Sequence, residues 1–132
     1  MADDEATDAL APQVREHYEH PYHRGNCPAA THSLRRESPL CGDWVRVSLQ
    51  ISAGDRIEQA WFDGDGCVIS QAAASLLIEQ IEGMTRQQVR QFSAAQMLQL
   101  VGPGLLPSRQ KCCLLPWRVV QRALDTPLAE DA

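Results

Sequence analysis

Hydrophobic and polar residues alternate most regularly in the segment from Trp44 to Ile51. There Val45, Val47, Leu49 and Ile51 alternate with Trp44, Arg46, Ser48 and Gln50, a pattern that predicts a strand with one buried face. Ser52 to Asp55 predict a turn, and Arg56 to Asp63 predict a second strand. The apolar residues of this second strand break strict alternation, which indicates a bulge or burial on both faces. The short connection predicts an antiparallel hairpin.

Helical periodicity flanks the hairpin on both sides. Upstream, Leu10, Val14 and Tyr18 recur four apart and predict an amphipathic helix from Asp8 to Glu19. Pro21 to Leu40 has no periodicity and predicts a long loop. Downstream, an apolar stripe from Ile69 to Ile81 predicts a helix that stops at Gly83.

Three more helices are predicted after Gly83. Thr85 with Gln88 forms a capping box for a short helix, and Ser93 is the expected N-cap of another. A last helix is expected to begin near Pro116, because the fixed φ of proline suits a first turn, and to end at Leu124.

This order of elements predicts a single α+β domain over residues 1–132. We expect a small antiparallel sheet of about three strands, helices packed on one face, and an N-terminal helix. Residues 1–7 and 126–132 are expected to be flexible ends.

The charge balance narrows the function classes. The chain has 12 basic and 17 acidic residues, a formal net charge of -5, and no long basic run, so neither nucleic acid nor an anionic membrane is the expected main partner. It has no apolar run of the roughly 20 residues that span a bilayer and no secretory signal pattern, and a cytoplasmic location is expected. A local basic face remains possible where Arg109, Lys111, Arg118 and Arg122 cluster.

Three of the five cysteines fall at predicted junctions between elements: Cys41 before the first strand, Cys67 between strand and helix, and Cys112 before the last helix. Asp43 follows Cys41 by two residues. Three thiolates and a carboxylate complete a tetrahedral set for zinc, and thiolates also hold iron-sulfur clusters. Gaps of 26 and 45 residues match no zinc-ribbon spacing, however, and for any single cysteine a small buried hydrophobe is the favoured explanation.

Motifs around these cysteines add a family resemblance. They are Cys41-Gly42-Asp43 after Pro39, the run from Phe62 to Ser70 that contains Gly64-Asp65-Gly66-Cys67, Lys111-Cys112 ahead of Leu115 and Trp117, and His17 to Pro21 with Arg24-Gly25 upstream. In this order they resemble the U-type iron-sulfur assembly scaffolds, which are the IscU, SufU and NifU N-terminal proteins with a SufE/NifU-like fold. The resemblance covers nearly the whole chain.

The resemblance implies a function and a ligand set. It implies that Cys41, Asp43, Cys67 and Cys112 bind zinc or a transient 2Fe–2S or 4Fe–4S cluster. It also implies that Cys41 accepts persulfide sulfur from a cysteine desulfurase of the SufS or IscS kind, with cluster carriers or apo-proteins downstream. The expected protein is a scaffold or sulfur acceptor, not a turnover enzyme.

Two features of the sequence, the residues around the third cysteine and the chain length, distinguish SufU from IscU proteins. Lys111 precedes the third cysteine as in SufU proteins, where IscU proteins have a histidine ligand, and Trp117 also favours SufU. The chain lacks the insertion that SufU proteins carry before that cysteine, so it is SufU-like in motif and IscU-like in length. Ser38 replaces the usual asparagine.

The remaining candidate residues have plainer explanations. Cys113 is expected to be a core thiol and Cys27 an exposed one, and the Asp63 and Asp65 pair is expected to form a turn instead of a calcium loop. His17, His20 and His23 could bind metal, but a solvated surface cluster is the preferred interpretation. Lys111 beside Cys112 could favour its thiolate.

Two other function classes compete with the scaffold hypothesis. A structural zinc-binding domain for protein interaction would use the same ligands as a closed site. A hydrolytic zinc enzyme is disfavoured, because three cysteines and an aspartate leave no open position for water.

Overall fold

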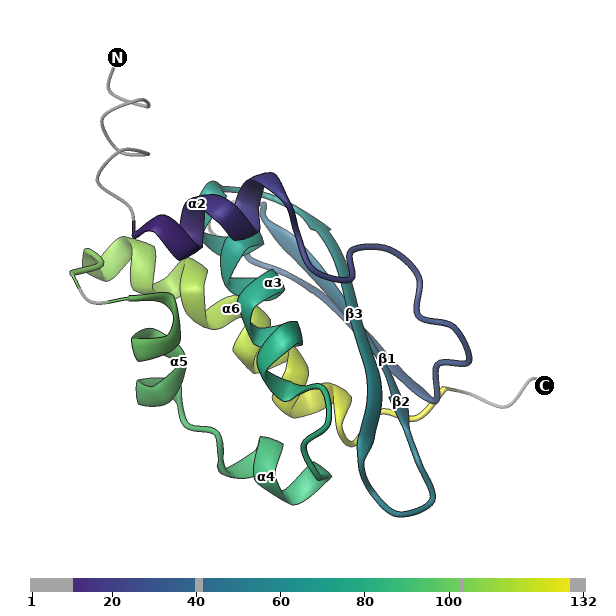
Figure 1. The fold of residues 1–132 in the computed structure, drawn as a ribbon. Coiled ribbons are helices and arrows are strands. Elements are labelled where there is room, and N and C mark those ends of the chain that lie inside the picture. Colours follow the sequence, from purple (N-terminus) through teal and green to yellow (C-terminus); the bar gives the residue numbers. More distant parts are fainter. Residues whose placement is uncertain (1–10, 40–41, 103, 129–132) are drawn as a thin grey trace.

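The computed structural model describes residues 11–39, 42–102 and 104–128. Strands β1 (His32–Glu37), β2 (Trp44–Ile51) and β3 (Ile57–Asp65) form one antiparallel sheet in the order β1-β2-β3. The helices are α2 (Pro12–Glu19), α3 (Val68–Ile81), α4 (Arg86–Gln91), α5 (Ala94–Val101) and α6 (Pro107–Ala123). They gather on one side of the sheet, as Figure 1 shows, and the predicted α+β architecture is confirmed.

The central hairpin follows the predicted alternation. Val45, Val47, Leu49 and Ile51 of β2 are all buried beneath the helices. The pairing of β2 with β3 shifts register between Gln50 and Ile51, which is the irregularity that the second strand's pattern indicated. Strand β3 continues through Asp65, two residues beyond its predicted end, so the Asp63 and Asp65 pair lies in a strand and the predicted turn there is wrong.

Strand β1 was missed by the sequence analysis, which predicted a loop from Pro21 to Leu40. It forms one edge of the sheet and pairs with β2 from His32 opposite Leu49 to Glu37 opposite Trp44. Only Leu34 packs against the core, and the strand's second half is exposed. An edge strand with so little buried apolar surface leaves no hydrophobic pattern to detect.

Helix α3 lies at the centre of the helical layer. Eleven of its fourteen residues are buried, and it packs against α2, α5, α6 and β3. The next two helices begin as predicted, because Thr85 with Gln88 and Ser93 with Gln96 both form complete capping boxes.

Helix α6 begins earlier than the sequence suggested. Pro107 occupies its first turn, whereas Pro116, the predicted start, lies buried inside the helix. The start predicted from the sequence is Pro116, whereas the helix starts at Pro107. Cys112 therefore lies within the helix and not, as predicted, before it.

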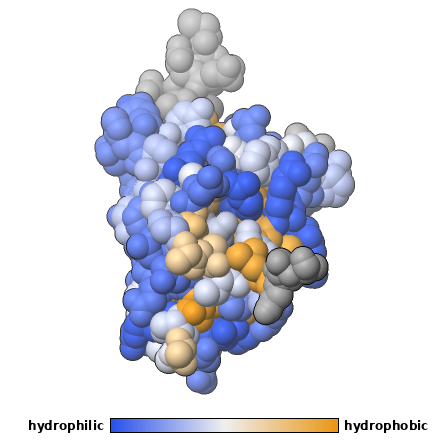
Figure 2. Space-filling view, turned by 90° about the vertical axis from the view of Figure 1, so that its right-hand side faces the viewer, coloured by the Kyte–Doolittle hydropathy of each residue, from blue (hydrophilic) through white to orange (hydrophobic). Residues whose placement is uncertain are grey.

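The segment between α2 and β1 covers the far side of the sheet. Gly25 N donates to the carbonyl of Phe62 at 2.8 Å, and Arg46 of β2 reaches Asn26 at 3.1 Å. The rings of Tyr22, His23 and Trp61 stack with centroid separations of 4.0 and 4.3 Å. Figure 2 shows this side of the molecule as mostly hydrophilic, with apolar residues gathered in its middle and lower part.

The two ends of the described chain join this scaffold differently. Val14 of α2 is buried against the core, while residues 8–10 of the predicted first helix lie outside the described residues. After α6, Pro127 bridges to His32 and Leu128 N donates to Thr31 O at 2.9 Å. Among the described residues, none of the helices combines the length and the apolar character needed to cross a membrane.

The hydrogen bond from the Tyr22 hydroxyl to Glu82 generates a pH prediction. This bond, reinforced by burial and by the charge of Glu82, raises the pKa of Tyr22 to about 12. Between pH 10 and 12 the unfolded chain releases the tyrosine proton while the native protein keeps it, so the free energy of unfolding should fall across this window. Denaturant melts of wild type and Tyr22→Phe should differ in pH dependence there, and identical curves would contradict the assignment.

Candidate metal centre

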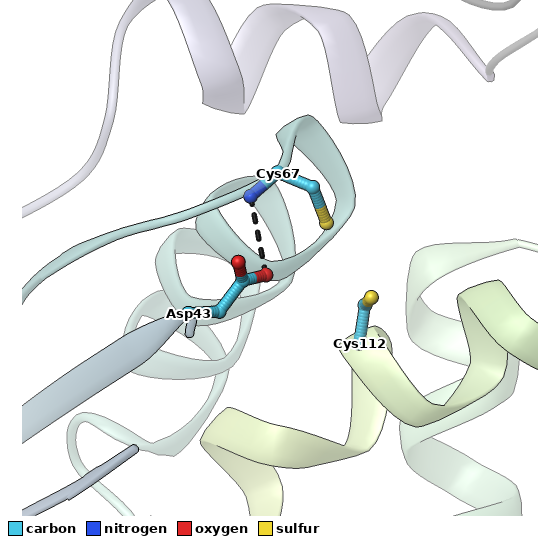
Figure 3. Close-up of side chains that lie close together, drawn as sticks. All are labelled: Asp43, Cys67 and Cys112. Atoms are coloured by element: carbon cyan, nitrogen blue, oxygen red, sulfur yellow. Dashed lines mark hydrogen bonds between the residues drawn. The ribbon is translucent and has the colours of Figure 1, made fainter. Parts of the chain in front are cut away.

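Three potential ligands converge from three separate elements. Asp43 immediately precedes β2, Cys67 is the N-cap of α3, and Cys112 lies in the second turn of α6. One ligand atom from each lies within 4.8 Å of the other two, and no other such group of three occurs among the described residues. Figure 3 shows the two thiols and the carboxylate facing a common space.

The Asp43 carboxylate is held by the first turn of α3. Its Oδ2 accepts hydrogen bonds from the backbone N–H of Cys67 and from the Ser70 hydroxyl, both at 3.2 Å. Asp43 is only 8% exposed, so these bonds compensate for the water that it has lost. Within the described part of the chain Oδ1 accepts no hydrogen bond, which leaves that oxygen available for a metal ion.

Gly66 makes room for this carboxylate. A Cβ atom at position 66 would lie 2.4 Å from the Asp43 Cγ, and the φ of +155° is one that side chains rarely adopt. Only glycine therefore allows the chain to turn from β3 into α3 with Asp43 seated against it.

The Cys67 sulfur receives a hydrogen bond of its own. Ser70 N donates to Sγ at 3.4 Å, so the side chain caps the helix that it precedes. The N-terminus of a helix favours a negative charge, because its first N–H groups point outward without backbone partners. This position therefore suits a thiolate.

Cys112 is carried on a turn of α6 that proline modifies. Pro116, four residues later, has no N–H to donate to the Cys112 carbonyl, and a proline ring crowds the carbonyl at this spacing. The regular helical hydrogen bond from residue 116 to the Cys112 carbonyl is therefore missing where the sulfur enters the site.

Cys41, the fourth predicted ligand, lies outside the described residues. The ends of its loop are described: Ser38 N donates to Asp43 O at 2.7 Å, and Gly42 N donates to Ser38 O at 3.0 Å. Gly42 has a φ of +77°, in the left-handed region that favours glycine. The position of Cys41 in the site remains a prediction.

The converging groups lie in an open groove of about 970 Å³ between α6 and the end of β1. Its lining consists of Arg36, Glu37, Ser38, Pro39, Asp43, Cys67, Ser108, Arg109, Lys111, Cys112, Leu115, Arg118, Val119 and Arg122. Ligand atoms around tetrahedral zinc lie about 3.5–3.8 Å apart, so the observed separations need only small side-chain movements. The donor set therefore fits a zinc ion.

The other two described cysteines take no part in this group. Cys113 is fully buried, and burial raises its pKa to about 11, so it is a neutral core thiol as predicted. Cys27 is partly buried in the loop, which raises the pKa of its thiol, and Sγ donates to the carbonyl of Pro28 at 3.4 Å.

The histidines near the N-terminus form no shared site. His17 contacts Ser75 at 2.7 Å and Glu79 at 3.4 Å, whereas His23 lies 2.8 Å from Glu82 and stacks on Trp61. These two rings therefore attach α2 and its loop to α3 and β3. The expectation of a purely solvated cluster missed these contacts.

Two contributors to the site escaped the sequence analysis. Ser70 was noted in a motif without a role, although a serine three residues after a helix N-cap can reach the same turn. Arg36 was assigned to a loop because β1 was not recognised.

The contacts of Ser70 predict a measurable effect on zinc affinity. Ser70→Ala removes the hydroxyl that orients Asp43, and loss of such a supporting bond typically weakens metal affinity about 10-fold or more. Competition with a chromophoric chelator measures this change. Ser75→Ala is the matched control, since Ser75 is equally buried in α3 but bonds to His17 and Tyr22. An equal loss of affinity in both variants would contradict an orienting role.

Comparison with known proteins agrees with the fold. The profile of the family described as NifU-like N terminal domain matches residues 9–129. A zinc-dependent sulfurtransferase SufU from Bacillus subtilis (strain 168) is 29% identical, with 84% of this chain and 86% of the relative covered. An iron-sulfur cluster assembly scaffold protein IscU from Thermotoga maritima is 30% identical, with 76% and 82% covered.

Solved structures of similar proteins share the fold of this chain. A crystal structure of the SUF-system protein FiSufU from Fervidobacterium islandicum AW-1 superposes with a TM-score of 0.69 at 28% identity, covering 86% of this chain and 95% of that one. A NifU-like N-terminal structure from Brucella abortus, at 19% identity and a TM-score of 0.62 with 87% and 91% covered, shares the fold. This chain belongs to the NifU-like N-terminal domain family.

Proposed function

We propose that this protein accepts sulfur from a cysteine desulfurase during iron-sulfur cluster assembly. The observation that carries this proposal is the convergence of Asp43, Cys67 and Cys112 within 4.8 Å in an open groove. The proposed site adds Cys41 as the fourth ligand. Its neighbours Pro39 and Asp43, two residues away on either side, both line that groove.

The donor set suits zinc as the resident ion. Cys41, Asp43, Cys67 and Cys112 would supply three sulfur atoms and one oxygen in a tetrahedral arrangement. When bound, zinc keeps the thiols deprotonated and lends order to three chain segments that are far apart in the sequence.

Cys41 is the proposed sulfur acceptor. Its thiolate attacks the outer sulfur of the donor's protonated persulfide; the donor's sulfur–sulfur bond breaks as the Cys41 persulfide forms, and the donor cysteine leaves as a thiolate. The proton stays on the transferred sulfur, and no external oxidant or reductant is needed. The flanking Gly42, with its φ of +77°, gives the loop a backbone geometry that a bulkier residue would resist.

Two related roles fit this site. A zinc-containing sulfur acceptor is favoured by Lys111, which stands where IscU proteins carry a ligating histidine, and by the likeness to the Bacillus subtilis SufU. A scaffold on which a cluster is built is favoured by Asp43, because an oxygen donor binds iron more weakly than a thiolate and eases cluster release. In this second role iron and sulfur are the cargo.

The proposed sulfur transfer needs a sulfur donor, an acceptor of the product and a reducing compartment. The partner is a cysteine desulfurase of the SufS or IscS kind, and cluster carriers or apo-proteins receive the product. The reducing cytoplasm would keep the thiols available. The protein would act as a sulfur-transfer partner and have no turnover of its own beyond that transfer.

Incubation with iron, cysteine and a desulfurase tests both roles. Wild-type protein should carry about one zinc per chain as isolated and accelerate sulfide production by the desulfurase. Elemental analysis and anaerobic absorption spectra then separate the roles, since a scaffold develops iron-sulfur charge-transfer bands and a zinc acceptor does not.

Substitutions of the proposed ligands test which residues bind the metal. Cys41→Ser, Cys67→Ser and Cys112→Ser should each lower zinc content and abolish stimulation. Asp43→Ala should weaken zinc binding without abolishing it, and should slow the release of a cluster, because the weaker iron–oxygen bond is gone. Cys113→Ser is the control, because that thiol faces the core. Retained zinc and stimulation in all three cysteine variants would refute the site. Zinc that resists added persulfide, with unfolding on chelation, would indicate the structural zinc domain instead.

A further inference from the structure

The groove beside the metal centre has an unusual charge for this chain. The protein as a whole carries a formal net charge of -5. Among the described residues, five basic side chains and two carboxylates, Glu37 and Asp43, line the groove. The five basic residues are Arg36, Arg109, Lys111, Arg118 and Arg122. A concave surface with one sign of charge attracts ligands of the opposite sign.

These five side chains lack ion-pair partners within the described chain. Several arginines elsewhere are paired, as Arg24 and Arg46 are with Asp63, and Arg90 is with Asp125. By contrast, no groove cation lies within 4.0 Å of a described carboxylate. Like charges held together without partners repel one another, and a negatively charged ligand would remove that cost.

Helix α6 arranges its cations in one stripe. Lys111, Arg118 and Arg122 follow one another at spacings of seven and four residues, which places the three on one side of the helix. Cys112 is turned by about 100° from Lys111, in line with Leu115 and Val119, and lines the same groove. All three are exposed, while Leu115 and Val119 form an apolar strip between them and the core. The metal centre thus lies at one end of a basic stripe.

Only the basic side chains nearest to the metal site can compensate for the negative charge of its thiolates and carboxylate. Lys111 adjoins Cys112, but Arg118 and Arg122 lie about 9 and 15 Å further along the helix axis, at 1.5 Å per residue. The Debye length at physiological ionic strength is about 8 Å, so the charge of Arg122 acts mainly on whatever occupies the groove beside it. A single ligand that pairs with both Lys111 and Arg122 must therefore be extended.

We propose that the groove receives an extended acidic segment of the sulfur-donor protein, running along α6 from Cys112 to Arg122. A span of about 15 Å corresponds to four or five extended residues. The segment would flank the donor's persulfide cysteine, so that its carboxylates pair with the stripe while the persulfide reaches the thiolates. This inference rests on the proposed function, since it names the recognition element of the same donor.

Charge reversals test the proposal with purified cysteine desulfurase from the source organism. Arg118→Glu and Arg122→Glu should each weaken its binding about 10-fold or more at low salt, mainly through the association rate, and the difference should shrink as sodium chloride is added. Zinc content and melting temperature should stay at wild-type values, because neither side chain is among the proposed ligands.

Arg35→Glu is the matched control. This substitution changes the net charge by the same amount and lies next to Arg36 on β1. Arg35, however, stacks over Trp44 and does not line the groove. Equal weakening by the control and the groove variants would overturn the proposal. The proposal would also be overturned if the wild type formed a dimer and the groove variants did not, because a second copy of the chain would then occupy the groove. If the wild type neither binds the desulfurase nor accepts sulfur at any salt concentration, the proposed function itself fails.

Discussion

The site depends on the clamp between the Asp43 carboxylate and the first turn of α3. This carboxylate lies at the start of the central strand, is almost fully buried, and is compensated by the Cys67 N–H and the Ser70 hydroxyl. The missing side chain of Gly66 makes the approach possible. Because Cys67 belongs to the same turn, the contact that seats the oxygen ligand also fixes one sulfur beside it. Two of the proposed ligands are thus preorganised by the fold.

The third described ligand is held differently. Cys112 projects from α6, which packs on β1, β2 and α3 and therefore reaches the site by packing of the helical layer. Pro116 removes the regular helical hydrogen bond to its carbonyl, so the Cys112 side of the site lacks one backbone hydrogen bond that a regular helix would have.

Sequence patterns predicted those parts of the fold in which burial is periodic. The alternation in β2 and the apolar stripe of α3 carry most of the core, and the capping boxes at Thr85 and Ser93 fixed two helix starts. Strand β1 could not be found in this way, because an exposed edge strand is stabilised by backbone pairing more than by buried side chains. The start of α6 was misplaced because proline is compatible with a first turn and, less often, with a helix interior.

The site could be predicted in composition but not in arrangement. Motif order named Asp43, Cys67 and Cys112, yet the spacing alone left each cysteine explicable as a core thiol, as Cys113 proved to be. The role of Ser70 depends on a bond across 27 residues of sequence, which no local pattern encodes. The basic groove likewise required Arg36 on the unrecognised β1 to face the cations of α6.

X-ray absorption spectroscopy of the zinc-loaded protein tests the central claim most directly, because it counts the atoms bound to the metal. Three sulfur atoms at about 2.3 Å and one oxygen at about 2.0–2.2 Å are predicted, with Asp43→Cys converting the site to four sulfur atoms. A wild-type shell of four sulfur atoms, or one made mainly of nitrogen and oxygen, would contradict a centre built from Cys41, Asp43, Cys67 and Cys112.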